Sequence, residues 1–235
     1  MFLDFIDSLG SSRRRVHQNR INGEMECKVD IGIIFDDTGF TSGQDWTSMI
    51  KFVIRLAEFL KISDNGPHFG VTTYGKETAR VIIKLNDYTD LTSLTNALKD
   101  IKRNVTFASS LWLGIDYTLT RLFTVAEGAR EDVPKAIILV TSGRCDLCNV
   151  GEKNEHKMTR LANMIDQAGH KMFVLGVDAT YDSIKQLFNI EQFVDRSNFF
   201  DVTDFDKLLD ETLINNLTTV CDGMFFFVWQ IKRCL

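Results

Sequence analysis

The feature that most constrains this chain is an alternation of short aliphatic runs with segments of helical periodicity. Residues 29–35 and 135–140 are rich in β-branched and aliphatic side chains, as expected of strands that are buried on both faces. Between them, apolar residues from 44 to 61 recur every three or four positions, which predicts an amphipathic helix. Strands that alternate with helices predict a mostly parallel sheet with helices packed against it.

The same alternation continues through the rest of the chain. Further strands are expected at residues 68–74, 79–85, 171–177 and 198–201, and further helices at 91–101, 111–123, 156–168, 181–188 and 204–217. The strand at 79–85 follows a tight turn at Gly75-Lys76, so it is expected to be antiparallel and at an edge. The predicted fold is therefore α/β and doubly wound, with a six-stranded, Rossmann-like sheet, helices on both faces and one antiparallel edge strand.

The length of 235 residues, with 44% hydrophobic and 25% charged residues, favours one large domain with a substantial core. We expect a flexible N-terminal tail at residues 1–26, the domain at 27–221 and a C-terminal tail at 222–235. Most of the 18 phenylalanines, Phe59 among them, fit strand or helix interiors and are expected in the core.

The charge distribution and hydropathy exclude some partners. The net charge is −5 and no basic block exceeds Arg13-Arg14-Arg15, which argues against nucleic acid as a partner. No apolar run reaches the roughly 20 residues needed to span a bilayer, so no membrane insertion is expected. The N-terminus does not resemble a secretory signal; if the protein is secreted, this sequence is a fragment or a mature segment.

Polar side chains gather where three predicted strands end. Asp36 and Thr38 follow the first strand, Ser109 precedes the helix at 111–123, and Ser142 follows the strand at 135–140. In open α/β sheets ligands bind beyond the carboxyl ends of the strands. Acidic and hydroxyl oxygens at that edge are typical ligands of a hard cation such as Mg²⁺.

The stretch Asp36-Asp37-Thr38-Gly39-Phe40, then Ser109, then Val140-Thr141-Ser142-Gly143 resembles a von Willebrand factor A-type domain over about residues 28–219. That family carries a metal-ion-dependent adhesion site, with Asp-x-Ser-x-Ser in the first loop, Thr in the second and Asp in the third. The resemblance implies the metal ligands Asp36, Thr38 and Ser109.

Two positions depart from this pattern. Phe40 offers no oxygen where the second Ser should be, and Ser142 offers a neutral hydroxyl in place of a carboxylate. Mg²⁺ sheds its water reluctantly, so these losses predict a site that binds the ion weakly or not at all. The alternative is a metal-free edge at which Asp36 accepts hydrogen bonds from loop amides.

Five cysteines allow two pairs and one left over, Cys234. In a doubly wound fold Cys27 and Cys221 fall on the same edge of the sheet, and many secreted members of the family are closed in a similar way. These two are expected to form a disulfide, although two reduced thiols are an alternative. Cys145 and Cys148 are expected to form a local disulfide, with a redox dithiol or half of a zinc site as alternatives.

Two sequons and three aromatic residues complete the candidate sites. Asn104 and Asn216 are glycosylation sites only if the chain enters the secretory pathway. Phe107 and Trp112 flank the second-loop serine and, with Phe40, are candidate ligand contacts, although core burial competes for Trp112.

The function expected from the resemblance is a non-enzymatic, extracellular protein-binding or cell-adhesion module whose partner is a matrix or cell-surface protein. One alternative is an intracellular scaffold with reduced cysteines. Another is an enzyme that uses a cation or a nucleotide at the same edge. This second alternative lacks support, because no histidine is placed to act as a base there and no phosphate-binding loop is found.

Overall fold

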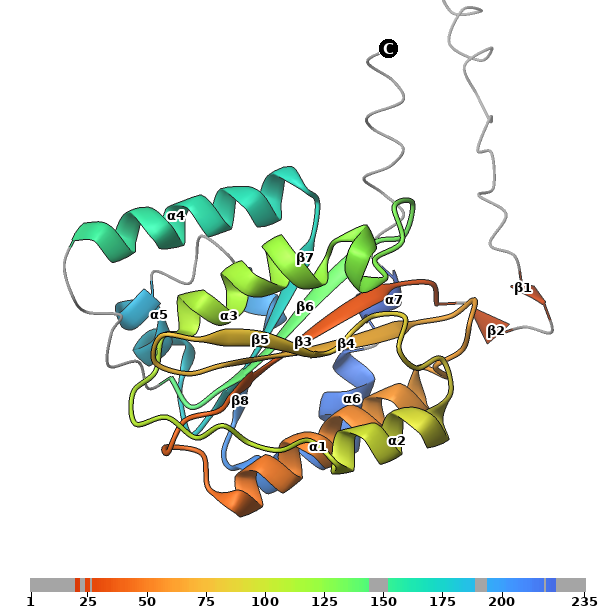
Figure 1. Cartoon of the computed structure of the whole chain (residues 1–235), viewed down its shortest axis with the longest axis horizontal. Helices are drawn as coiled ribbons and strands as arrows, with labels where there is room; N and C mark the ends of the chain where they lie inside the picture. Colours follow the sequence, from red (N-terminus) through yellow and green to blue (C-terminus); the bar gives the residue numbers. More distant parts are fainter. Residues whose placement is uncertain are drawn as a thin grey trace, which may run out of the picture.

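The computed structural model describes residues 20–21, 24–25, 27–143, 152–188, 194–217 and 219–222. Its centre is a six-stranded sheet in the order β5-β4-β3-β6-β7-β8 (Figure 1). The strands are β3 (Asp30–Asp36), β4 (His68–Tyr74), β5 (Ala79–Ile83), β6 (Lys135–Thr141), β7 (Lys171–Val177) and β8 (Phe199–Val202). Every neighbouring pair is parallel except β4 and β5, so the predicted sheet with one antiparallel edge strand is confirmed.

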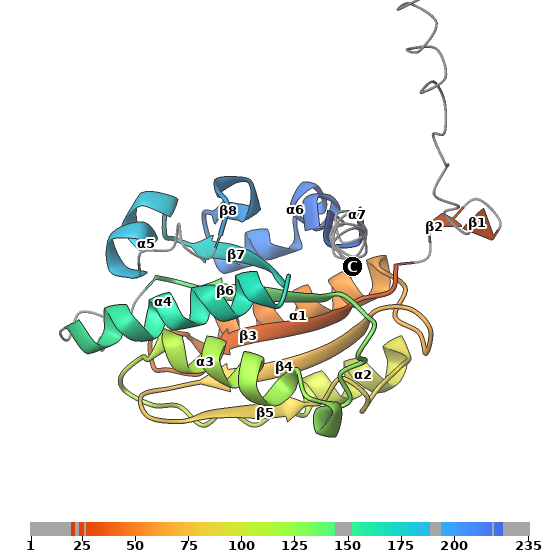
Figure 2. The same ribbon diagram turned by 90° about the horizontal axis from the view of Figure 1, so that it is seen from above.

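Helices cover both faces of the sheet (Figures 1 and 2). One face packs against α1 (Gly43–Phe59), α2 (Leu91–Lys99), α6 (Glu211–Leu217) and α7 (Thr219–Asp222), the other against α3 (Leu111–Tyr117), α4 (Glu152–Gln167) and α5 (Tyr181–Phe188). Short 3₁₀ turns occupy Val125–Glu127, Arg196–Asn198 and Phe205–Leu209, and a separate hairpin joins β1 (Arg20–Ile21) to β2 (Glu24–Met25). Among the helices described, none is long and apolar enough to cross a membrane.

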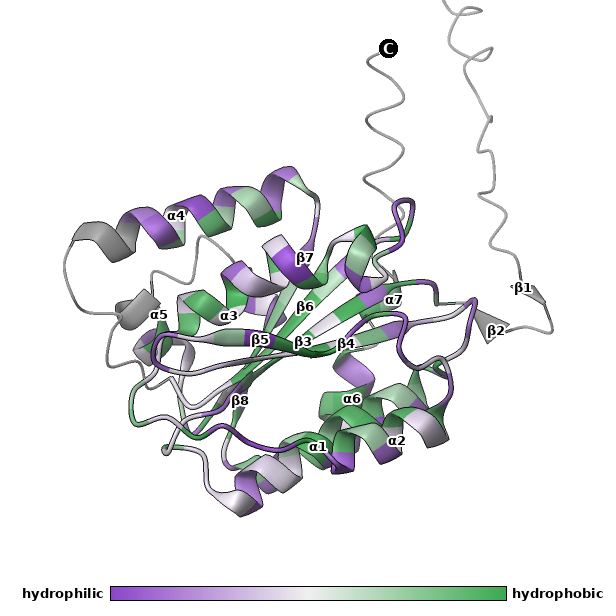
Figure 3. Cartoon of the chain, in the orientation of Figure 1, coloured by the Kyte–Doolittle hydropathy of each residue, from purple (hydrophilic) through white to green (hydrophobic). Residues whose placement is uncertain are grey.

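The central strand β3 is buried along its whole length, and it separates two apolar cores. Figure 3 shows the hydrophobic residues concentrated in the strands and on the helix surfaces that face them. Helix α1 begins at a reciprocal cap, in which Ser42 Oγ accepts from the Asp45 N–H and the Asp45 carboxylate accepts from the Ser42 N–H. This cap fixes where the chain leaves the loop after β3.

The helix predicted at 111–123 departs from regular geometry in its second half. Helix α3 ends at Tyr117, and residues Thr118–Leu122 form a π-helical turn. This turn packs directly on the sheet, where a Cβ added at Gly32 would meet Thr118 at 2.8 Å and one added at Gly70 would meet Leu122 at 2.5 Å. The two strand glycines therefore permit this close approach.

Two further expectations are wrong. The helix predicted at 204–217 is a 3₁₀ turn followed by α6, because Asp210 between them is extended and its carboxylate accepts from the Thr212 N–H, as a helix N-cap does. Phe59 is not a core residue, since it lies at the end of α1 with 44% of its surface exposed.

The edge at which the parallel strands begin, the amino edge, is closed by strong contacts. Asp30, at the start of β3, pairs with Arg130 at 2.7 Å, and the Arg130 guanidinium also donates to the carbonyls of Val29 and Gly66. The expected disulfide between Cys27 and Cys221 is present, with an S–S distance of 2.01 Å.

Candidate functional site

The candidate site lies at the carboxyl edge of the sheet, where the parallel strands end. Asp36 is the last residue of β3 and is 2% exposed. Its Oδ1 accepts from the Thr38 N–H at 3.0 Å, whereas its Oδ2 has no hydrogen-bond partner among the described residues. Burial raises the pKa of Asp36 to about 6, although the hydrogen bond from Thr38 and the nearby hydroxyl of Tyr74 act in the opposite direction. The hydrogen bonds from the protein thus do not fully compensate this carboxylate for the loss of its hydrating water.

Tyr74 is a residue of this site that sequence reasoning missed. It ends β4 in register with Asp36, and its ring is buried. Burial and the neighbouring charge of Asp36 raise the pKa of the Tyr74 hydroxyl well above its usual value. The hydroxyl therefore stays protonated beside the carboxylate, without a well-formed hydrogen bond to any described residue. Its position at the end of a strand next to the first strand was the available signal.

The remaining predicted ligands sit around this pair. Ser109 is fully buried at the end of the second loop, residues 101–110. The Ser142 hydroxyl is buried after β6 without a hydrogen-bond partner in the described part of the chain. Thr38 is buried, and its Oγ1 accepts from the N–H of Phe40 at 3.4 Å, so the half-buried Phe40 belongs to the turn itself.

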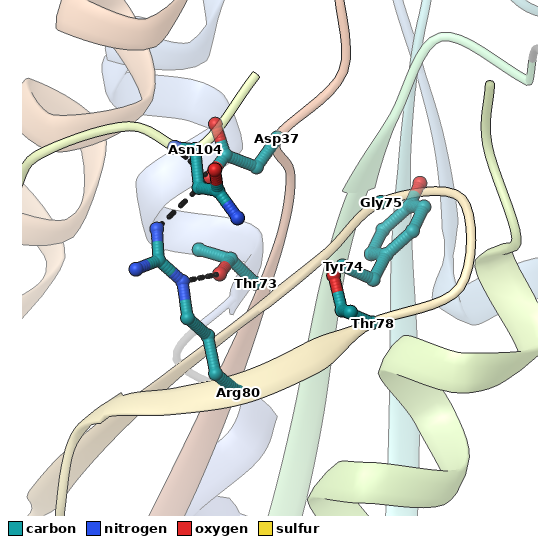
Figure 4. A pocket seen from close by; sticks show the side chains of 7 residues that line it. All are labelled: Asp37, Thr73, Tyr74, Gly75, Thr78, Arg80 and Asn104. Carbon is teal, nitrogen blue, oxygen red and sulfur yellow. Dashed lines mark hydrogen bonds and ion pairs between the residues drawn. The ribbon is translucent and has the colours of Figure 1, made fainter. Parts of the chain in front are cut away.

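Asp37, next to Asp36, turns to a different set of partners. Arg80 Nη2 donates to its Oδ2 at 3.2 Å and Arg103 Nε donates to its Oδ1 at 3.3 Å. The backbone N–H of Asn104 donates to the same carboxylate at 2.7 Å. The Asp37 side chain is 3% exposed, so this pair of arginines neutralises a buried charge. Figure 4 shows the contact between Arg80 and Asp37.

Arg103 also connects the two loops directly. Its Nη2 donates to the Thr38 carbonyl at 2.9 Å, and its guanidinium lies 5.0 Å from the centroid of the Trp46 ring. Backbone contacts run in parallel with it, because Thr38 and Thr106 form an isolated parallel bridge and the Gly39 N–H donates to the Thr106 carbonyl at 2.7 Å. The first and second loops are therefore joined by direct protein contacts.

These donors match the needs of Mg²⁺ poorly. Among the described residues, the site offers one available carboxylate, Asp36, whose charged form is made less favourable by burial, and the neighbouring carboxylate of Asp37 is bound by two arginines. Across the described residues, no three His, Cys, Asp or Glu side chains are grouped so as to hold a metal ion. Mg²⁺ needs near-octahedral oxygen coordination with compensating negative charge, which hydroxyls alone do not supply.

The second loop also presents apolar side chains to solvent. Phe107 is 93% exposed and Val105 is 49% exposed. Trp112, by contrast, is half-buried against the core on the α3 side, with the Lys157 ammonium 3.8 Å from its ring centroid. The loop that carries Phe107 is held in place, since Thr106 Oγ1 donates to the Ala108 carbonyl at 3.1 Å and accepts from the Lys76 N–H at 3.1 Å.

The family model of the von Willebrand factor type A domain matches residues 30–214, which is most of the chain. The chain belongs to the von Willebrand factor type A domain family. Its sequence is similar to mouse integrin alpha-X, with 27% identity over 89% of the chain and 18% of the integrin, and to mouse matrilin-3, with 26% identity over 77% of the chain and 37% of the matrilin.

Other relatives include chicken integrin alpha-1, at 24% identity over 76% of the chain and 63% of that protein. The chain thus spans less than two thirds of the length of each of these curated relatives. Among solved structures, proximal thread matrix protein 1 from the mussel byssus superimposes with a TM-score of 0.67 at 19% identity, over 83% of this chain and 48% of that one. Another structure of that protein has zinc in its adhesion site, and the manganese-loaded Plasmodium vivax TRAP protein has a TM-score of 0.57 at 16% identity, over 79% of this chain and 73% of that one.

The other predicted site residues fall in two groups, and two arginines of the site were not predicted. Asn104 and Asn216 are both exposed, in the second loop and in α6 respectively. Cys145 and Cys148 lie outside the described residues, so their expected disulfide stays a prediction. The missed residues, Arg80 and Arg103, are brought to Asp37 only by the pairing of β4 with β5 and by the course of the second loop.

Proposed function

We propose that this von Willebrand A domain is a non-enzymatic, extracellular module for protein binding or cell adhesion whose carboxyl edge works without a resident Mg²⁺. The observation that carries the proposal is the double arginine contact to Asp37, in which Arg103 also donates to the Thr38 carbonyl. A divalent cation at this edge would hold the loops together through its ligands. Here the guanidinium of Arg103 has the same effect.

Three observations support the metal-free reading. Asp36 is the one available carboxylate that the described residues leave at the site, and burial makes its charged form less favourable. Phe40 contributes a ring to the turn instead of an oxygen ligand. The Tyr74 hydroxyl, whose pKa is raised, stays neutral and supplies no second anionic ligand next to Asp36.

The extracellular role rests on the disulfide and the relatives. A Cys27–Cys221 bond persists in an oxidising compartment, and such bonds are rare in the cytosol. Integrins and matrilins are proteins of cell adhesion and of the extracellular matrix. An intracellular scaffold would keep both thiols reduced. Alkylation of the natively expressed chain under non-reducing conditions therefore separates the two roles by mass.

The proposed contact surface is the exposed part of the second loop. Phe107 and Val105 are presented on a loop that cannot fold them inward, because its backbone is bridged to the first loop. An exposed aromatic side chain on an anchored loop is a favourable contact, since the loop backbone loses little conformational entropy on binding. Phe40 and Trp112, both half-buried, are the proposed secondary contacts.

The first test is thermal unfolding of the oxidised chain in EDTA and in millimolar Mg²⁺ or Mn²⁺. A ligand that binds only the folded state raises the unfolding midpoint, so we expect the midpoint to be the same in all three conditions. A midpoint that rises with the cation, and loses this rise in Asp36→Asn, would contradict the metal-free proposal.

The second test examines the arginine contact by hydrogen exchange in EDTA. The amides of Gly39, Asn104 and Thr106 donate hydrogen bonds between or within the loops and should exchange slowly. Arg103→Met should speed their exchange. Arg55→Met removes a surface arginine from exposed ion pairs and serves as the matched control, which should leave these amides unchanged.

A further inference from the structure

The sequon Asn104-Val105-Thr106 lies in the second loop, at the carboxyl edge itself. We propose that Asn104 carries an N-linked glycan, which covers the side of this edge next to the turn between β4 and β5. The inference rests on the extracellular role proposed above, because the sequon is read only in the secretory pathway.

The local geometry leaves the Asn104 side chain available. Its backbone N–H is bonded to the Asp37 carboxylate at 2.7 Å, so the backbone is anchored without help from the side chain. The residue is exposed, and in the described part of the chain its side-chain amide takes part in no hydrogen bond. A sugar on Nδ2 would therefore break no existing contact.

The third residue of the sequon is compatible with the finished fold as well. Thr106 Oγ1 donates to the Ala108 carbonyl and accepts from the Lys76 N–H, and both contacts remain when Asn104 is modified. Val105 is half-exposed, so no buried side chain must move. The glycan can thus be added before folding and be accommodated afterwards.

Attachment transfers the oligosaccharide from its lipid pyrophosphate carrier in the secretory pathway to the side chain of Asn104. The Asn104 Nδ2 forms a bond to the anomeric carbon of the first N-acetylglucosamine and loses one proton to the transferase or to solvent. The bond between that carbon and the pyrophosphate oxygen breaks, and its electron pair leaves with the lipid pyrophosphate. Neither an oxidant nor a reductant is required.

The place of Asn104 determines what the glycan covers. Asn104 lines a small pocket together with Asp37, Thr73, Tyr74, Gly75, Thr78 and Arg80. In Figure 4 Asn104, Asp37 and Arg80 stand on one side of this pocket, opposite Tyr74, Gly75 and Thr78. A bulky, hydrated glycan that starts there covers the pocket mouth and the adjoining turn.

The second sequon gives a weaker case. Asn216 is exposed in α6, far along the chain from this edge, and Thr218 lies outside the described residues. A glycan at Asn216 would leave the carboxyl edge open. Asn216→Gln is therefore the natural matched control.

The test is expression of the 235-residue chain behind a secretion leader in eukaryotic cells. The secreted protein is treated with peptide N-glycosidase F in heavy-oxygen water and then digested with trypsin. Cleavage after Arg103 and Arg121 gives a peptide of residues 104–121, in which Asn104 is the only asparagine. We expect this peptide as the heavy-oxygen aspartate form in wild type, Asn216→Gln and the conservative Thr106→Ser, and a loss of that form in Asn104→Gln.

The outcomes separate this inference from the proposed function. A secreted chain with the Cys27–Cys221 bond but an unmodified 104–121 peptide would overturn the glycan alone. A chain whose thiols remain open to alkylation would overturn the extracellular role and the glycan with it. For coverage, acylation of Lys76, whose backbone contacts Thr106, should be slower before deglycosylation than after, while the exposed Lys51 of α1 keeps one rate. Equal rates at Lys76 would refute the coverage.

Discussion

Strand β3 carries a buried aspartate at each end, and the two carboxylates have different surroundings. Asp30, at the amino edge, is fully buried, and Arg130 supplies both oxygens with donors, its Nε at 2.7 Å and its backbone N–H at 2.8 Å. Asp36, at the carboxyl edge, is 2% exposed, with one oxygen bonded to the Thr38 N–H and the other without a partner in the described residues. Within the described residues, both carboxylate oxygens of Asp30 thus accept hydrogen bonds, whereas only one oxygen of Asp36 does.

This difference suggests different roles: we interpret Asp30 as a residue that stabilises the fold and Asp36 as a residue of the candidate site. The amino edge combines an ion pair with a disulfide, and its polar groups hold the ends of the domain together. In the part of the chain that the structure describes, the carboxyl edge keeps oxygens without hydrogen-bond partners on Asp36, Tyr74 and Ser142. Buried polar groups without partners reduce stability, and they persist mostly where function places them. We therefore propose that these oxygens mark a site whose ligand set no longer suits Mg²⁺.

The largest effect is expected at the amino edge. Asp30→Ala leaves the Arg130 guanidinium buried without its carboxylate, which should lower the free energy of unfolding by about 3–5 kcal/mol. Glu58→Ala removes an exposed partner of Arg55 and should cost less than about 1 kcal/mol. Urea unfolding of both variants at neutral pH measures the difference. Equal losses would show that Asp30 is no more important than a surface charge.

Asp36→Asn should raise the free energy of unfolding at neutral pH. The pKa of Asp36 is raised from 3.8 to about 6 by burial, so the folded state binds a proton that the unfolded state has already released. Stability attributable to this group is complete below pH 3.8 and is lost as the pH rises through 6. The gap corresponds to about 3 kcal/mol at most, so the asparagine variant should be more stable than wild type by up to that amount at pH 7.5.

The pH profile distinguishes this cause from a simple change in packing. In EDTA, the stability difference between wild type and Asp36→Asn should vanish near pH 4 and grow between pH 4 and 7. Asparagine still accepts the Thr38 N–H, so the turn is preserved. A difference that is constant with pH would mean that ionisation of Asp36 plays no part.

The sequence predicts the fold well because both periodicities are strong. The aliphatic runs of β3 and β6 and the spacing of α1 leave little choice of topology. The misses arise where tertiary contacts or a single cap overrule local pattern. Gly32 and Gly70 leave room for the π-helical turn to pack closely on the sheet. Asp210 ends the 3₁₀ turn and begins α6, so the helix expected at 204–217 is divided.

The site is predictable only in part. Asp36 and Ser109 were found because they follow strands or precede helices in a known motif, and Ser142 because it departs from that motif. Arg103 and Tyr74 were missed, since neither belongs to the motif. Their roles depend on the register of β3 with β4 and on the course of the second loop.

Restoring the missing ligands should allow the carboxyl edge to bind a cation, which would give Asp36 the charged partner that Asp30 has in Arg130. Phe40→Ser with Ser142→Asp supplies an oxygen and a second carboxylate next to Asp36, which gives Mg²⁺ or Mn²⁺ the ligands it requires. In this double variant, a cation at several times its dissociation constant should raise the stability by about 1 kcal/mol, whereas wild type should not respond. Calorimetric scans with and without EDTA measure this. No response in the double variant would indicate that the arginines at Asp37, and not the lost ligands, keep the cation away.

The smallest effect on stability is expected for Phe107→Ser. Phe107 is 93% exposed on the second loop, so its loss should change the free energy of unfolding by less than about 0.5 kcal/mol. Phe59→Ser is the control, because Phe59 is an exposed phenylalanine at the C-terminal end of α1, outside the second loop. It is 44% exposed, so its truncation should cost more stability than that of Phe107. Retention on immobilised extracellular matrix, measured in EDTA, should fall for Phe107→Ser and stay at the wild-type level for Phe59→Ser. If the two variants lose retention equally, the second loop is not the contact surface, and the exposed aromatic side chain at the carboxyl edge needs another explanation.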